Sequence, residues 1–214
     1  HPVARALLAA FARLGGHGIA APSANRFGHV SPTTAAHVAD DLGTAVDLIL
    51  DGGPSAVGIE STIVSFAGGA PMLLRPGGIG PEAIARVLGT PPRAADGSAP
   101  RASGTLASHY APHTRTLLVP ADALHAMLAQ HATREERVAV LARSVREPEG
   151  FDGAWIAAPR DPTGYAHGLY ASLRSLEAST ADVILVESIP ATPEWLAVGD
   201  RLSRATHGED DDRD

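Results

Sequence analysis

The protein chain contains 214 residues, with a formal net charge of −7, a hydrophobic content of 44% and no cysteine. The lack of cysteine excludes disulfides and cysteine-bound zinc, and because all 17 basic residues are arginine, these residues hold no catalytic or phosphate-binding lysine. The acidic balance argues against stable direct binding of nucleic acid, and no apolar run approaches a membrane span, so we expect a globular cytoplasmic protein with no membrane attachment.

The first 89 residues alternate short apolar runs with glycine-containing turns. Ser31-Pro32 is typical of an N-cap followed by proline in the first helical turn, so we expect a helix from there to about Leu42. The sequence Gly80-Pro81-Glu82 opens another helix, which ends at Gly89. The remaining runs predict a helix at 2–14 and strands at 18–21, 46–50, 62–66 and 72–74.

Residues 90–113 are rich in proline, alanine, serine and glycine and show no periodicity, which indicates a linker or an ordered covering loop. Beyond them, apolar runs alternate with helical patterns. This alternation predicts parallel crossover connections and a small Rossmann-like α/β domain of three layers. The expected strands are 117–119, 138–141, 154–157 and 183–186, and the expected helices are 121–131, 165–178 and 193–206.

We therefore expect a first domain over 1–89, a linker over 90–113 that covers the active site, a second domain over 114–207 and a disordered acidic tail over 208–214. The chain starts with His1 rather than methionine and enters helical sequence at once. We expect an N-terminal truncation of the first domain.

Hydroxyl and amide side chains gather beside the predicted strand ends and the helix start of the first domain. Hydroxyls and backbone N–H groups at the Ser31 helix start would favour a bound anion. The alternative is that Ser31 only caps its helix and that its neighbours only form a turn. The candidates are Ser23, Asn25, Ser31, Thr33, Ser61 and Thr62.

Arg75 follows an apolar run at a predicted strand end, where its guanidinium could make a forked contact to phosphate. A surface salt bridge is the alternative. In the linker, His109 could serve as an acid–base group, and Tyr110 could stack on a purine or anchor the loop by packing.

The other histidines are scattered, including His29 and His113, and no spacing suggests a protein-built metal site. The sequence also contains no nucleophile elbow, P-loop or GxGxxG motif. We assign no catalytic nucleophile and no protein-bound metal.

Four motifs in order carry a resemblance: PSAN at 22–25, SPT at 31–33, GIEST at 58–62 and LRPG at 74–77. Together they resemble the YrdC-like threonylcarbamoyl-AMP synthase family. The segment SGTLASHYAP at 103–112 is similar to the linker of the family, and the alternating region after it resembles the second domain of the longer members. The implied fold is α/β: the C-terminal part of a YrdC-like twisted-sheet domain, followed by the Rossmann-like parallel domain.

The resemblance implies that L-threonine, bicarbonate or CO2, and ATP give threonylcarbamoyl-AMP and pyrophosphate, with Mg2+ carried by the triphosphate. The product would supply the threonylcarbamoyl group for modification of tRNA adenosine 37 by a partner transferase. The implied site residues are Ala21 and Ser61 for threonine, Ser23, Ser31, Arg75 and Tyr110 for ATP, and Asn25 and His109 as possible additions.

Two departures from the family pattern matter. The lysine–arginine phosphate motif and the early threonine-binding residues of the family are absent, so we expect this piece alone to be inactive. The linker reads Ala-Ser-Gly at 102–104 where the family has Ser-Pro-Gly. An RNA-binding module and a regulatory nucleotide-binding protein without catalysis remain the alternatives.

Overall fold

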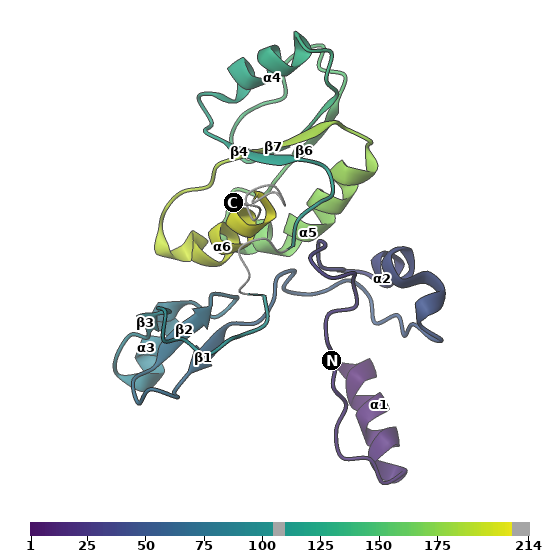
Figure 1. Ribbon diagram of the computed structural model, residues 1–214, viewed down its shortest axis with the longest axis vertical. Helices are drawn as coiled ribbons and strands as arrows, with labels where there is room; N and C mark the ends of the chain where they lie inside the picture. Colours follow the sequence, from purple (N-terminus) through teal and green to yellow (C-terminus); the bar gives the residue numbers. More distant parts are fainter. Residues whose placement is uncertain (105–109, 207–214) are drawn as a thin grey trace.

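A computed structural model describes residues 1–104 and 110–206, which form two β-sheets joined by the linker (Figure 1). One sheet has three strands and the other has four. None of the helices in these described ranges is both long enough and apolar enough to cross a membrane. The predicted α/β class is confirmed.

The four-stranded sheet lies in the C-terminal half and is entirely parallel. Its strands pair in the order β4-β7-β5-β6. All four predicted strands form, because each apolar run has a parallel neighbour with which to pair. Their bounds are Thr116–Val119 for β4, Val138–Ala142 for β5, Ala154–Ala157 for β6 and Val183–Glu187 for β7.

Side chains alternate between the two faces of this sheet, because successive strand residues point in opposite directions. Val138 and Val140 pack with helix α4 (Leu124–Ala132), whereas Ala139 and Leu141 pack with the other two helices. Figure 1 shows the same three layers, with α4 on one side of the sheet and α5 (Pro162–Ala178) and α6 (Leu196–Thr206) on the other. A short 3-10 turn, η2 (Pro193–Trp195), leads into α6.

The smaller sheet consists of β1 (Ile63–Ser65), β2 (Met72–Arg75) and β3 (Arg93–Ala94), with helix α3 (Pro81–Leu88) beside it. β1 and β2 pair antiparallel, and β2 and β3 pair parallel. The predicted strands at 62–66 and 72–74 and the helix after Gly80 are confirmed.

Three expectations for the N-terminal region are wrong. Helix α2 spans Ala35–Leu42 and is capped by Thr34, whose hydroxyl accepts a hydrogen bond from the His37 N–H, so Ser31 is not its N-cap. Residues 18–21 and 46–50 are not strands, because neither apolar run pairs with a neighbouring strand. Helix α1 (Pro2–Arg13) forms as expected and projects from the rest of the molecule (Figure 1).

The first part of the chain packs against the face of the larger sheet that carries α5 and α6. Val30 and Tyr110 belong to the same apolar core as these helices, and Ile59 packs against it. Gly58, with φ of +87°, approaches α5 so closely that a Cβ atom there would lie 2.3 Å from the carbonyl oxygen of His167. This contact brings the Gly58–Thr62 motif against the C-terminal domain.

Candidate active site

Glu60, between Gly58 and β1, is the centre of a polar network. Its Oε1 accepts a hydrogen bond of 2.6 Å from the Ser31 hydroxyl, and its Oε2 accepts bonds of 2.8 and 2.7 Å from Tyr170 and Arg201. Burial alone would raise the pKa of Glu60, but the hydrogen bonds from Ser31 and Arg201 outweigh it and hold that pKa below its usual value. Glu60 is therefore an ionised carboxylate that joins the Ser31 loop to α5 and α6.

Arg201 is completely buried, and each part of its guanidinium has a partner. Besides the bond to Glu60, Nη2 donates to the carbonyl of Pro76 at 3.0 Å and Nη1 donates to Asp200 at 2.5 Å. The guanidinium carbon lies 5.3 Å from the centre of the Tyr110 ring. Because its partners compensate the buried charge, the guanidinium of Arg201 can stay ionised inside the protein.

Arg75, at the end of β2, is buried and ties the smaller sheet to the linker. Its Nε donates to the carbonyl of Ser61 at 3.1 Å, and its Nη1 donates to the carbonyl of Ser103 at 2.8 Å and to the Tyr110 hydroxyl at 3.5 Å. Burial, reinforced by the nearby Glu60 carboxylate, raises the pKa of Tyr110. The phenol therefore stays protonated at neutral pH. The surface-salt-bridge alternative for Arg75 does not hold.

The predicted site residues thus fall into two groups. Ser31, Ser61, Arg75 and Tyr110 are joined through direct bonds or through Glu60. Ala21 and Ser23 are exposed, and in the described ranges no contact joins them to this cluster.

Asn25 shapes the loop that leads to Ser31. It donates from Nδ2 to the carbonyl of His29 at 3.0 Å, and its Oδ1 is buried with no hydrogen-bond partner among the described residues. His109 lies outside the described residues.

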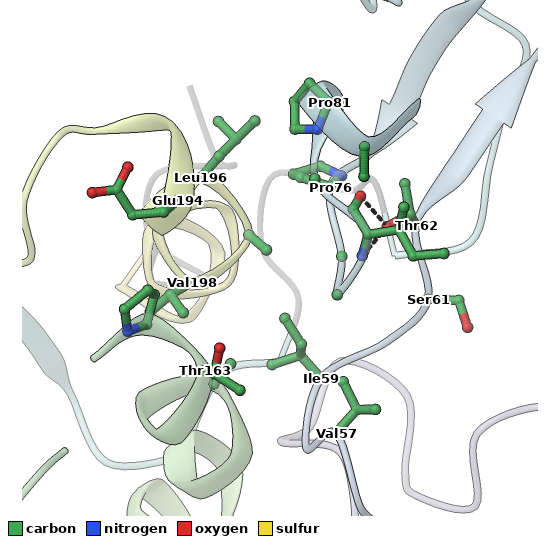
Figure 2. Close-up of a pocket in the computed structure, with 18 of the residues that line it drawn as sticks. Val57, Ile59, Ser61, Thr62, Pro76, Pro81, Thr163, Glu194, Leu196 and Val198 are labelled. Carbon is green, nitrogen blue, oxygen red and sulfur yellow. Dashed lines mark hydrogen bonds between the residues drawn. The ribbon is translucent and has the colours of Figure 1, made fainter. Parts of the chain in front are cut away.

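A cavity of about 730 Å³ opens beside this cluster, between the smaller sheet and the C-terminal helices (Figure 2). Glu60, Ser61 and Pro76 line it from one side, and Thr163 and Glu194 line it from the other. Figure 2 shows the Ser61 hydroxyl pointing away from the C-terminal helices. Ser23, Ser31, Arg75 and Tyr110 do not line this cavity, so it does not bring together all of the residues predicted to contact ATP and threonine.

Comparisons with known proteins bear on this arrangement. A family model described as "Threonylcarbamoyl-AMP synthase, C-terminal domain" matches residues 79–207, which is more than half of the chain, and one described as "Telomere recombination" matches residues 1–77. The chain belongs to the two-domain, YrdC-like threonylcarbamoyl-AMP synthase family. The resemblance inferred from the four motifs is therefore confirmed, as is the order of a YrdC-like region followed by the C-terminal domain.

Members of this family with curated names are similar over nearly the whole chain. The threonylcarbamoyl-AMP synthase of Bacillus subtilis is 37% identical over 97% of this chain, and that of Schizosaccharomyces pombe is 34% identical over 96%. The crystal structure of P. abyssi Sua5 complexed with L-threonine has a TM-score of 0.77 and 29% identity, and covers 86% of this chain. The chain spans 61% and 55% of the length of the two curated relatives and 56% of that crystallised chain.

Sequence reasoning does not identify three residues of the polar network around Glu60: Glu60 itself, Tyr170 and Arg201. Glu60 lies within the GIEST motif, but a single acid among hydroxyl residues gives no sign of its partners. Arg201 could have been found, because it interrupts the apolar stripe of Val198 and Leu202 on a predicted helix, where a buried arginine requires an acidic partner.

Proposed function

We propose that the protein to which these residues belong is an L-threonylcarbamoyladenylate synthase. It would convert L-threonine, bicarbonate or CO2, and ATP into threonylcarbamoyl-AMP and pyrophosphate. The observation that carries this proposal is the buried guanidinium of Arg75, which holds the Ser61 carbonyl and the Tyr110 hydroxyl together in a chain of this family, with the Ser31 hydroxyl bound nearby to Glu60. A guanidinium close to hydroxyl groups supplies the donors that bind phosphate oxygens.

The reaction requires two anions to meet. The threonine amine adds to CO2 and loses a proton, which gives a carbamate. A carbamate oxygen then attacks the α-phosphorus of ATP, and as that bond forms, the bond from the α-phosphorus to its bridging oxygen breaks and pyrophosphate leaves. Such a displacement needs positioning and neutralisation of charge more than a protein nucleophile. This requirement agrees with a site in which we assign no nucleophile.

We assign the phosphate contact to Arg75. Its bonds to Ser61, Ser103 and Tyr110 are made by Nε and Nη1, so Nη2 is the nitrogen that would turn to a phosphate oxygen. The pairing of Glu60 with Arg201 matters here, because an unpaired carboxylate beside Ser31 would repel the triphosphate.

The remaining predicted residues would orient the substrates. We assign Ser23, Ser31 and Tyr110 to ATP and Ala21 and Ser61 to threonine, with Asn25 and His109 as additional members of the site. Mg2+ would arrive with the triphosphate as part of the substrate. Closure of the linker would exclude water from a mixed anhydride that hydrolyses readily. A cytoplasmic tRNA threonylcarbamoyl transferase would consume the product.

The test measures pyrophosphate release by the full gene product that contains these residues, with ATP, L-threonine and bicarbonate present. Release should require threonine, and the nucleotide product should be an adenylate. Arg75→Ala should lower kcat/KM for ATP at least tenfold, because a charge-assisted hydrogen bond contributes about 1.5–3 kcal/mol. Ser61→Ala, at an exposed position that does not threaten folding, should raise KM for threonine.

Arg137→Ala is the matched control, because Arg137 is exposed and pairs with Asp182 in the C-terminal domain. Its kinetics should equal those of the unchanged protein. Threonine-independent release would reject the proposal. Binding of ATP without any adenylate would favour the regulatory alternative, and RNA affinity with a steep salt dependence would favour the RNA-binding one.

A further inference from the structure

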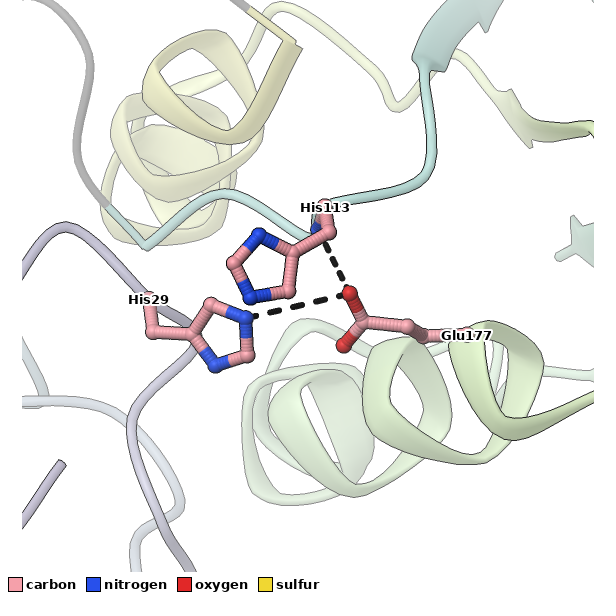
Figure 3. A group of neighbouring side chains, drawn as sticks. All are labelled: His29, His113 and Glu177. Carbon is pink, nitrogen blue, oxygen red and sulfur yellow. Dashed lines mark hydrogen bonds and ion pairs between the residues drawn. The ribbon is translucent and has the colours of Figure 1, made fainter. Parts of the chain in front are cut away.

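His29, His113 and Glu177 form a cluster of potential metal ligands where three distant segments meet (Figure 3). One ligand atom of each lies within 4.8 Å of the other two. His29 is in the loop that leads to Ser31, His113 follows the linker, and Glu177 is in the last turn of α5. Figure 3 shows the two imidazoles side by side, with the carboxylate facing both; the ring centres are 3.9 Å apart.

Both ring nitrogens of His29 are buried, and among the described residues neither has a hydrogen-bond partner. A buried polar atom without a hydrogen-bond partner is energetically unfavourable and rare in folded proteins, so it requires an explanation. Nε2 of His29 lies 3.8 Å from Oε1 of Glu177, and Nδ1 lies 3.9 Å from Oδ1 of Asp41. Both distances are too long for hydrogen bonds. The distance between Nε2 of His29 and Oε1 of Glu177 is instead close to the distance between two ligand atoms of one metal ion.

The surroundings of His29 favour one tautomer. Asp41 is held in place by Arg174, which donates from Nη1 at 3.0 Å and from Nη2 at 2.5 Å. A small movement would let Asp41 accept the Nδ1 proton of His29, which leaves the Nε2 lone pair directed towards Glu177. A carboxylate behind a metal-binding histidine is a common way to fix its ring and tautomer.

We propose that His29, His113 and Glu177 bind one Zn2+ ion. Two imidazole nitrogens and one carboxylate oxygen are a ligand set suited to zinc, whereas Mg2+ and Ca2+ prefer oxygen ligands throughout. A tetrahedral zinc ion with ligands at about 2.1 Å holds its donor atoms about 3.4 Å apart. Small rotations of the three side chains would bring their ligand atoms to that spacing, and water would occupy the fourth position.

The ion would act as a clamp on the linker. The two segments that carry the histidines already lie side by side, because the Ala111 N–H donates to the carbonyl of Gly28 at 3.0 Å. The backbone N–H of His113 also donates to Glu177 Oε1 at 2.5 Å. Zinc would lock the Ser31 loop and the Tyr110 segment onto α5. This inference does not depend on the proposed reaction.

The test uses the full chain and two probes, zinc chloride and cobalt chloride. Zinc affinity is measured by competition with a chromophoric chelator, and Co2+ binding is measured by the visible absorption of a four-coordinate complex. One equivalent of each ion should bind. His113→Ala and Glu177→Gln should weaken Zn2+ at least tenfold and abolish the cobalt bands. His113 is exposed, and glutamine keeps the shape of glutamate, so both variants should fold, which circular dichroism checks.

His125→Ala is the matched control, because His125 is an exposed histidine on α4 that makes no contact with the cluster among those described. Its Nε2 lies 3.2 Å from the carbonyl oxygen of Arg146. It should bind both ions as the unchanged chain does, and Zn2+ should raise Tm for it but not for His113→Ala. The proposal is overturned if the unchanged chain binds no stoichiometric zinc, if the two ligand variants bind it equally well, or if His125→Ala loses it to the same extent.

Discussion

At Glu60, one carboxylate accepts hydrogen bonds from side chains of a loop and of two helices of the other domain. Of its partners, Arg201 is completely buried and Tyr170 nearly so. Removing the carboxylate charge would leave the guanidinium of Arg201 with Asp200 and a carbonyl as its remaining partners. The stability of the interdomain contact therefore depends strongly on this single side chain.

Glu60→Gln tests this dependence. The amide replaces one acceptor oxygen with a donor, so at least one of the three hydrogen bonds is lost and Arg201 loses its main counter-charge. We expect the free energy of unfolding, measured by urea denaturation, to fall by about 2 kcal/mol. Asp182→Asn, which removes an exposed ion pair with Arg137, should lower stability much less, because solvent screens an exposed pair. Equal losses in the two variants would contradict the role given to Glu60.

The lowered pKa of Glu60 also makes stability depend on pH. The pKa in the folded protein lies below the reference value of 4.5. A carboxyl whose pKa is lowered by folding contributes stability that is complete above its unfolded pKa and is lost as pH falls through the folded pKa. Below about pH 4.5, the unchanged protein should therefore lose stability more steeply than Glu60→Gln, whose amide does not titrate. Urea midpoints across this pH range measure the difference, and parallel profiles would contradict it.

At the scale of elements, Gly58 determines how closely the segment before β1 approaches α5. Gly58→Ala should be strongly destabilising for two reasons: its φ is +87°, and the new methyl would lie 2.3 Å from the His167 carbonyl oxygen. Gly53→Ala is a matched control, because Gly53 has φ of +84° but a methyl group added there would have nothing within 4 Å.

The control separates the backbone strain of a positive φ, which both positions share, from the steric collision with α5, which occurs only at Gly58. Gly53→Ala should cost about 1–2 kcal/mol of unfolding free energy, and Gly58→Ala should cost at least about 2 kcal/mol more. Urea denaturation measures both. If the two substitutions have equal effects, the close packing of Gly58 on α5 does not limit the stability of the protein.

Elements of the larger sheet could be predicted from the sequence, whereas those of the N-terminal region could be predicted only in part. The run at Val138–Ala142 has neighbours on both sides, so its apolar pattern coincides with real pairing. The apolar run at 46–50 has no such neighbour, and Leu48 and Leu50 are exposed. Apolar pattern predicts burial, but a strand also requires a partner for its backbone groups.

The site shows the same limit. Hydroxyls and Arg75 could be selected from their motifs, because residue types and spacing are visible in the sequence. Their partners could not, since Glu60 meets Tyr170 and Arg201 across more than 100 positions. For the same reason, the scattered positions of the histidines predict no metal site, although the fold brings His29 and His113 together.

At the scale of the whole molecule, Arg174 is a bridge between the two domains. From α5 it donates to Asp41 and, through Nε at 3.3 Å, to the carbonyl of Ser31, and Nη2 also reaches the carbonyl of Val30. Its side chain is only 10% exposed. These bonds and the Glu60–Arg201 pair connect the first domain to the same helical face, so the two domains should unfold as coupled units.

Arg174→Met should weaken this coupling while keeping the length and apolar stem of the side chain. Breaking a buried ion pair from one side costs about 3–5 kcal/mol, which in urea shifts a midpoint by about 1 M or more. The loss should fall mainly on the first domain, because Asp41 is left there without its main partner. Both tryptophans, Trp155 and Trp195, lie in the C-terminal domain, so their fluorescence reports mainly on that domain.

Hydrogen exchange of α2 and of β1–β2, read by mass spectrometry, reports on the first domain. In the variant, its protection should be lost at a urea concentration well below the fluorescence midpoint, whereas in the unchanged protein the two should lie closer together. Arg137→Met removes an arginine whose hydrogen bonds stay within the C-terminal domain, and it should leave the separation unchanged. If the urea midpoints of both probes fall together in Arg174→Met, the two domains still unfold as one unit without Arg174. Their coupling would then not depend on this side chain.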